Sequence, residues 1–368
     1  MRAPLKLFLA NRLPLLAVCY LGLSLHKQVS HPWRAFPNDL FLDGWFRWDS
    51  GWYLRIARDG YAPIPGDQQP TNFFPLYPLS VRGLSWLTGD PFIAAFLLSN
   101  LALLLACVWL YRFLVESYGE ETARRSLLLL LCAPFAYAYS AMYTESFFLV
   151  SAAGAFLFAK RKQWLFASLC AAAGGATRLV GVGLLLPVGL YYLESCDWNW
   201  RKVRWGALWL PLGAAGVGAH MVYLSIRFND PLAFLRAQWV GGGWGADMTW
   251  ASLVEQLGKA THWNLLAAGA FELNALLNLA VALALLGALL LGWRRVGLIP
   301  TVWALATFFV SLRIWKASGR YACVVFPSFV AVAQLTEERP QLFEAILYCS
   351  TLLLALLTFL FSHGDWVC

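Results

Sequence analysis

Apolar stretches with the length of a membrane-spanning helix recur along the sequence from its beginning to its end. A straight transmembrane helix needs about 20 apolar residues. Stretches of this kind reach from the N-terminus to about residue 25 and cover 91–115, 206–226, 265–291 and 342–361. Each predicts one crossing. The pattern therefore indicates an all-α polytopic transmembrane protein for which lipid is the main solvent.

Three other apolar stretches have an intermediate length and are interrupted by polar residues. They cover residues 127–159, 163–193 and 298–335, with the polar residues at 140–146, 177–178 and 313–320. Each is too long for one crossing and too short for two, which predicts a hairpin of two short helices. A helix of about 15 residues is about 22 Å long, which is less than the thickness of about 30 Å of the hydrocarbon core of a membrane. Irregular polar backbone at that depth is tolerated beside a water-filled cavity, so the three tips are predicted to line one recess.

Four basic clusters set the expected orientation, at 124–125, 160–162, 201–204 and 294–295. Positively charged loops stay on the cytoplasmic side, which predicts about eleven crossings with the N-terminus inside and the C-terminus outside. The segments 26–90 and 227–264 become the external loops of a single transmembrane domain over residues 1–368. The recess is then expected to open outward. Orientation explains the net charge of +8, so nucleic acid is not an expected partner.

The composition narrows the chemistry. Hydrophobic residues make up 60% of the chain and charged residues 13%, whereas soluble domains are about a quarter charged. A soluble nucleotide-binding domain is not expected, because no strand–glycine loop–helix pattern is present. The eight cysteines form no CxxC and the five histidines no HExxH, so neither a metal nor a cofactor is predicted. The N-terminal stretch lacks a small-x-small cleavage site, which favours an uncleaved helix over a signal peptide.

Basic residues on the predicted outer side need a reason, because such loops rarely carry them without a function. Arg178 lies at the second hairpin tip among apolar neighbours, and Lys316 and Arg320 lie at the third. A ligand phosphate would account for all three. Glu145, at the tip of the first hairpin, could instead form an ion pair with Arg178 or Arg320. Both alternatives stay open, and an ionisable group at membrane depth makes Glu145 a functional candidate as well.

The densest polar and aromatic cluster covers residues 43–53, after the first helix. Trp45, Trp48, Trp52 and Tyr53 recur at helical spacing, which predicts an amphipathic helix in the membrane interface. Interfacial anchoring explains the aromatic residues but leaves Asp49 among them unexplained. A carboxylate so placed is a candidate general base.

The segment 72–78 is apolar and aromatic but interrupted by prolines, so it is not expected to span the membrane. Phe73, Phe74 and Tyr77 are predicted to contact the prenyl or acyl chain of a lipid substrate. Plain interfacial anchoring is the alternative. Glu272, Asn274 and Asn278, within 265–291, are expected to make hydrogen bonds between helices.

Several motifs resemble those of the PIG-V family, the GPI mannosyltransferase 2 type. They are Arg47-Trp48-Asp49-Ser50-Gly51-Trp52-Tyr53 with Gly60-Tyr61, Phe73-Phe74-Pro75-Leu76-Tyr77-Pro78, Tyr143-Thr144-Glu145-Ser146, Ala176-Thr177-Arg178, and Gly319-Arg320-Tyr321 with Phe326-Pro327. The motifs follow in the family's order and span most of the chain. Eukaryotic members are longer, and they have a sequence similar to Arg-Ser-Asn-Gly where this chain has Arg178-Leu179-Val180-Gly181. This chain therefore looks like a prokaryotic member.

The resemblance implies a GT-C-type fold and an inverting mannosyltransferase that takes its sugar from polyprenyl- or dolichyl-phosphate mannose. Asp49 matches the family's essential loop aspartate. Arg178, Lys316 and Arg320 would bind the donor phosphate without a metal. The residues expected to bind sugar or acceptor are Trp48, Trp52, Tyr53, Tyr143 and Glu145. The implied acceptor is a glycolipid, at the outer face of the plasma membrane in a prokaryote or the luminal face of the endoplasmic reticulum in a eukaryote.

Two alternatives are kept. A GT-C transferase could use another sugar or an acceptor that is not a glycolipid. A secondary transporter is the alternative of a different class, but it predicts inverted repeats with broken helices in matching halves. The hairpins here all open to one side.

Overall fold

The computed structural model describes residues 2–26, 39–62, 70–239, 251, 254 and 270–367, and all regular structure in these residues is helical. Five segments are long and apolar enough to cross a membrane. They are α1 (Arg2–Leu25), α5 (Pro91–Tyr118), the continuous η5 (Trp205–Ala214) and α10 (Ala215–Phe228), α13 (Ala270–Val296) and α17 (Pro340–His363). The predicted all-α transmembrane fold is confirmed, while the count of about eleven crossings stays a prediction.

The three expected hairpins are present as pairs of shorter helices. The first joins α6 (Glu120–Leu131) to α7 (Glu145–Lys160) through η2 (Ala136–Tyr139). The second joins α8 (Trp164–Thr177) to η3 (Leu179–Leu184) and α9 (Leu185–Ser195). The third joins α14 (Leu298–Ser311) to α16 (Phe326–Leu335) through η7 (Leu312–Ala317) and α15 (Ser318–Ala322). With 16 residues, α7 is about 24 Å long, which is shorter than a hydrocarbon core of about 30 Å.

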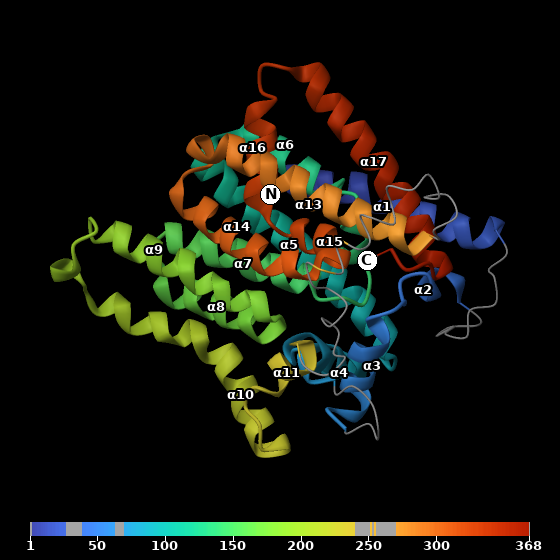
Figure 1. Cartoon of the computed structure of the whole chain (residues 1–368), viewed down its shortest axis with the longest axis horizontal. Helices are drawn as coiled ribbons and strands as arrows, with labels where there is room; N and C mark the ends of the chain where they lie inside the picture. Colours follow the sequence, from blue (N-terminus) through green and yellow to red (C-terminus); the bar gives the residue numbers. More distant parts are fainter. Residues whose placement is uncertain are drawn as a thin grey trace.

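The α7 helix forms the centre of the bundle, because most of its side chains are buried on all sides. Its Phe156 packs edge-on against Trp303 of α14 and Phe326 of α16, with ring centroids 5.2 and 4.9 Å apart. The α7 helix packs against α5, α8 and α9. Figure 1 shows α8–α10 on one side of the bundle and α1 beside α17 on the other. The first residue of α7 is Glu145, so this buried helix fixes the position of that carboxylate.

The described parts of the two predicted external loops gather at one end of the bundle. They form α2 (Leu40–Asp43), α3 (Ser50–Asp59), η1 (Pro70–Asn72), α4 (Leu76–Thr88) and α11 (Ala233–Trp239). Figure 1 shows α3, α4 and α11 side by side there. The prolines of the segment 72–78 start α4 rather than break it, since Pro75 caps the helix and Pro78 lies in its first turn. A proline is tolerated in that turn because its missing N–H has no helical partner there.

The aromatic helix predicted around residues 45–53 begins later than its spacing suggested. Trp48 has a left-handed backbone with φ 52°, and α3 starts only at Ser50. The residues before it are held instead by polar contacts of Arg47, which are described below. The helical spacing of Trp45 and Trp48 with Trp52 therefore does not reflect one continuous helix.

Small residues bring α8 very close to η5 and α10. A Cβ added at Gly216 would lie 1.8 Å from the carbonyl oxygen of Ala172. At Gly218, two residues further along α10, an added Cβ would meet no atom within 4 Å. Helices in membranes use small residues to approach in this way.

We expect Gly216→Ala to lower the free energy of unfolding by about 3 kcal/mol or more, the upper part of the usual range for an overpacked site, because two helix backbones must separate to admit the methyl group. Gly218→Ala is the matched control and should be neutral or slightly stabilising, since alanine favours helix by up to about 1 kcal/mol over glycine. Thermal unfolding of both variants in detergent measures the difference. Equal melting temperatures would contradict the close packing.

Candidate active site

Asp49 stands at the start of α3, in the first of the two loops that the sequence predicts to be external. Aspartate at this position usually accepts a hydrogen bond from the first turn of its own helix, but the Asp49 side chain makes no such bond. Its carboxylate instead accepts a hydrogen bond from Arg320 of α15, with 3.0 Å between Nη1 and Oδ2. The first loop and the third hairpin tip therefore meet at an ion pair.

The same arginine continues to the other two hairpin tips. Arg320 Nε lies 3.4 Å from Glu145 Oε1, and Arg178 Nη1 lies 3.3 Å from the same oxygen. The sequence predicted that the three hairpin tips meet, and the structure brings Glu145, Arg178 and Arg320 of these tips together with Asp49 of the first loop. We call these four side chains the ionic cluster.

The ionic cluster is balanced in charge and uneven in exposure. Glu145 and Arg320 are buried, with 2% and 6% of their side chains exposed, and Arg178 is 13% exposed. Asp49 is the most accessible member, at 25%. A molecule that approaches the cluster from solvent therefore meets the Asp49 carboxylate more readily than the other three groups.

Two tyrosines flank the guanidinium groups. The ring centroid of Tyr321 lies 4.5 Å from Arg178 Cζ and 5.2 Å from Arg320 Cζ. Tyr143 lies 4.8 Å from Arg320 Cζ. Aromatic faces at these distances attract and orient cations. The sequence predicted a role in the site for Tyr143, whereas Tyr321 entered only as part of a motif and its position between the two arginines was missed.

Asn278 of α13 positions the third tip. Its side-chain oxygen accepts a hydrogen bond from the backbone N–H of Arg320 at 3.3 Å. A Cβ added at Gly319 would lie 2.9 Å from Asn278 Cα, so the glycine allows α15 to approach α13. The sequence predicted helix–helix hydrogen bonding for Asn278, and the structure directs that bond to the arginine of the cluster.

The first tip is held by Arg12 of α1. Its Nη2 donates to the carbonyl oxygen of Leu131 at 3.1 Å, and its Nη1 donates to that of Ala136 at 2.9 Å. Nη1 also donates to Ser140 Oγ at 3.3 Å. The Arg12 side chain is buried, and it satisfies the carbonyl group of Leu131, which the end of α6 leaves without a helical partner.

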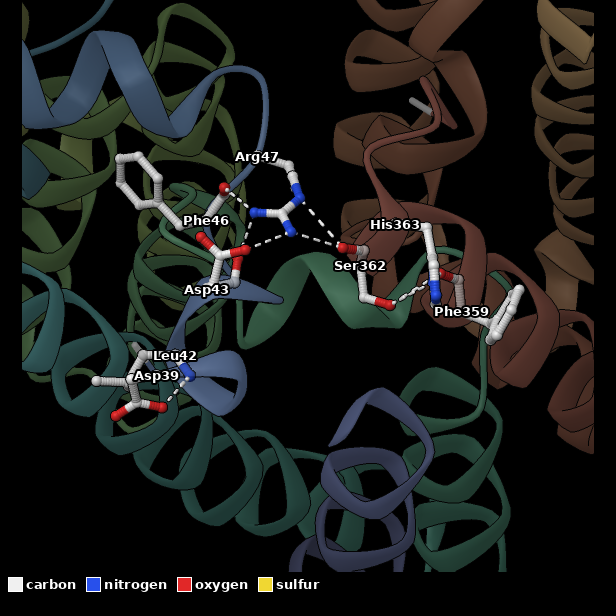
Figure 2. A network of polar contacts seen from close by, with 8 residues as sticks. All are labelled: Asp39, Leu42, Asp43, Phe46, Arg47, Phe359, Ser362 and His363. Atoms are coloured by element: carbon white, nitrogen blue, oxygen red, sulfur yellow. Dashed lines mark hydrogen bonds and ion pairs between the residues drawn. The ribbon is translucent and has the colours of Figure 1, made fainter. Parts of the chain in front are cut away.

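Arg47 fastens the loop that precedes Asp49 to the end of α17. Figure 2 shows its guanidinium between the carboxylate of Asp43 and the carbonyl oxygen of Ser362. Nη2 lies 2.8 Å from Asp43 Oδ2 and 2.7 Å from the Ser362 oxygen. Both charged side chains are buried. Breaking a buried pair is costly, which gives the loop a fixed starting point next to Asp49.

The predicted sugar- or acceptor-binding aromatics occupy different positions. Trp48 is 43% exposed and donates from Nε1 to the carbonyl oxygen of Asp365 at 3.1 Å. Tyr53 is buried, and its hydroxyl lies 3.3 Å from Thr144 Oγ1, one residue before Glu145. Burial, together with the negative charge of Asp49, raises the pKa of Tyr53. Its hydroxyl therefore stays protonated and can donate a hydrogen bond.

The three residues predicted to contact a lipid tail are packed inside the protein. Phe73 is stacked on Trp52 with 5.8 Å between ring centroids, and Phe74 packs against His220 at 4.7 Å. Tyr77 is fully buried, with its hydroxyl 2.9 Å from Ser99 Oγ. Contact with a lipid tail stays a prediction for these residues.

Lys316 lies in η7, four residues before Arg320, and 8% of it is exposed. Its burial agrees with a position inside the bundle. Binding of a donor phosphate stays a prediction for Lys316.

The sequence profile of a family described as dolichyl-phosphate-mannose-protein mannosyltransferase matches residues 68–223. No curated protein matches the chain by sequence. Among solved structures, it is similar to ArnT from Cupriavidus metallidurans bound to undecaprenyl phosphate, with 16% identity over 92% of this chain and a TM-score of 0.50. The apo state of the same protein gives 17% identity, 93% coverage and a TM-score of 0.51.

This chain spans 61% of the length of ArnT. At this level of identity, the likeness concerns the fold. The resemblance to the PIG-V family stays a prediction. The chain has the all-α transmembrane fold of a GT-C-like protein, with its hairpin tips gathered around one ionic cluster.

Proposed function

We propose that this protein is a membrane glycosyltransferase that takes a sugar from a polyprenyl- or dolichyl-phosphate donor. The ionic cluster carries the proposal, because it brings a partly exposed carboxylate, a buried guanidinium group and a largely buried one together at the meeting point of the three hairpins. The matching family profile has a lipid-phosphate sugar in its description. The similar ArnT structure contains undecaprenyl phosphate.

In the proposed reaction, Asp49 acts as the general base. It takes the proton of an acceptor hydroxyl while the hydroxyl oxygen attacks the anomeric carbon of the sugar. The bond between that carbon and the donor phosphate oxygen breaks on the opposite side, which inverts the anomeric configuration. The lipid phosphate leaves with the bonding electrons.

Arg178 and Arg320 bind the leaving phosphate in this proposal, and Lys316 adds a third positive charge from η7. Guanidinium groups suit phosphate because they form paired, charge-assisted hydrogen bonds. In the structure their positive charges face Glu145 and Asp49. A donor phosphate would compete with these carboxylates, and transfer of Arg320 to the phosphate would free Asp49 for the acceptor. Donor binding would thereby release the Asp49 carboxylate from its ion pair, so that it can accept the proton of the acceptor hydroxyl.

Mannose is the proposed sugar and a glycolipid the proposed acceptor. The site would face the outside of the plasma membrane in a prokaryote or the lumen of the endoplasmic reticulum in a eukaryote. One observation favours a second acceptor class, because the description of the family that matches residues 68–223 names protein as the acceptor. A polypeptide hydroxyl is therefore the alternative acceptor. The same base and phosphate contacts would serve it.

We expect the purified full-length chain to transfer label from polyprenyl-phosphate mannose to an extracted glycolipid, with or without a chelator, and not from GDP-mannose. Scintillation counting of separated products measures this, and a parallel reaction with a serine- and threonine-rich peptide tests the alternative acceptor. Transfer from GDP-mannose alone would exclude the proposed donor. Loss of all transfer on chelation would exclude metal-free chemistry.

A further inference from the structure

A hollow lies at the end of α7 remote from the ionic cluster. It has a volume of about 490 Å³ and is lined by the ends of α5, α7, α9 and α13 and by the start of α14. Glu145 begins α7 and Lys160 ends it, so about 22 Å of helix separates the two sites. The volume of the hollow is typical of a site for a small molecule.

Positive charge predominates among the ionisable groups of this hollow. Lys160, Lys162 and Arg295 line it, together with a single carboxylate, that of Glu194. Lys160 Nζ donates to Ser117 Oγ at 2.7 Å, and Arg295 Nη1 donates to a backbone carbonyl oxygen at 2.8 Å. These acceptors are neutral. Among the described residues, none of the three cations forms an ion pair.

Neighbouring cations at the same end of the bundle behave differently. Arg161 forms an ion pair with Glu116, and Lys202 forms one with Asp197. The three cations of the hollow, in contrast, make no direct ion pair among the described residues, and they outnumber the one carboxylate, that of Glu194, that lines the hollow with them. That arrangement is typical of a site for an anion.

The start of α14 adds further positive potential. Gly297, Leu298 and Ile299 line the hollow, and the Gly297 cap supplies no side-chain acceptor to the first turn. The first N–H groups of a helix have no partner within the helix and attract anions. Here they accompany the three cationic side chains.

An apolar track leads away from the same rim. Leu298, Leu305 and Phe309 of α14 are 56%, 37% and 70% exposed. Their spacing of seven and eleven residues places them on one face of the helix. Trp198, which also lines the hollow, is 54% exposed, as is common for tryptophan at the level of lipid headgroups. A free phosphate ion would make no use of this track.

We propose that this hollow binds the phosphate headgroup of an anionic phospholipid, with an acyl chain along Leu298, Leu305 and Phe309. The phosphate contacts Lys160, Lys162 and the start of α14, and Arg295 closes the other side. The site lies at the membrane face opposite the ionic cluster. It therefore binds a structural or regulatory lipid, and not the glycosyl donor, and it does not depend on the proposed transfer reaction.

Lipid binding to the purified full-length chain in detergent tests the proposal, with affinities from a native mass spectrometry titration. Phosphatidylglycerol should bind more tightly than zwitterionic phosphatidylcholine. Lys162→Gln and Arg295→Gln should each weaken phosphatidylglycerol binding about fivefold, the effect of one cation near a lipid surface. Glu194→Gln should tighten it, because the negative charge that lines the hollow is removed. Arg124→Gln, with its ion pair to Glu121 outside the hollow, is the matched control and should leave the affinity unchanged.

Equal affinity for the two lipids, or affinities that none of the three hollow variants alters, would overturn the proposal. Inorganic phosphate forms a separate arm of the experiment. Full displacement of the lipid by millimolar phosphate would show a site for a free anion in place of a lipid. The opposite sign expected for Glu194→Gln guards against a general loss of folding, since a damaged fold does not bind lipid more tightly.

Discussion

Asp49→Asn should lower the rate of glycosyl transfer about 10²- to 10⁴-fold, the usual contribution of a general base. The amide cannot take the acceptor's proton. It keeps an oxygen that can accept a hydrogen bond from Arg320, at the position where Oδ2 now lies 3.0 Å from Nη1. The contacts of the ionic cluster, and with them the fold, should therefore survive. The measurement is kcat with saturating donor and acceptor, beside a thermal unfolding curve.

Asp59→Asn provides the matched control. Asp59 ends the same short helix that Asp49 begins, and it is exposed. The substitution changes the same charge within the same loop, so it should leave kcat unchanged. Turnover of Asp49→Asn within a few-fold of the unmodified protein would remove Asp49 from the role of base. An equal decrease of kcat in both variants would indicate that the total negative charge of the loop matters, and not Asp49 as a base.

The hairpins could be predicted from the sequence because their lengths and interruptions are local properties. A stretch such as 163–193 has too many apolar residues for one crossing, and Arg178 in its middle cannot lie in lipid unpaired. Those two facts predict that the chain turns at Arg178 and that an anion lies close to its guanidinium group. The same reasoning placed Glu145 and Arg320 at tips. Three polar tips at membrane depth then had to meet, and the structure confirms that they do.

The pairings inside the cluster could not be predicted in the same way. Asp49 and Arg320 are 271 residues apart in the chain, and no periodicity connects positions so distant. Tyr321 was missed because a tyrosine within an apolar stretch gives no sign that it will stand between two arginines. The sequence placed the start of α3 too early, because the spacing of Trp45, Trp48 and Trp52 suggested one continuous helix. The left-handed backbone of Trp48 interrupts that helix.

A second large effect is expected for Arg320→Lys. Lysine keeps the positive charge but has no planar group to lie between Tyr143 and Tyr321 or to reach Asp49 and Glu145 together. Loss of one charge-assisted hydrogen bond to the donor phosphate costs about 1.5–3 kcal/mol, or about 10- to 150-fold in affinity. We expect the donor KM to rise by that factor and the acceptor KM to stay within about twofold, because Arg320 is proposed to bind the phosphate only.

Arg125→Lys is the control that separates this role from packing. Arg125 is also partly buried, forms an ion pair with Glu121 at 2.7 Å, and lies 4.8 Å from the ring centroid of Phe343. It therefore has the same kinds of partner as Arg320, but at the remote end of the bundle. Its substitution should lower the melting temperature slightly and leave both KM values unchanged. If Arg320→Lys raised the KM of donor and acceptor equally, the arginine would be holding the site together rather than binding the phosphate. A donor KM that did not change would exclude Arg320 from phosphate binding altogether.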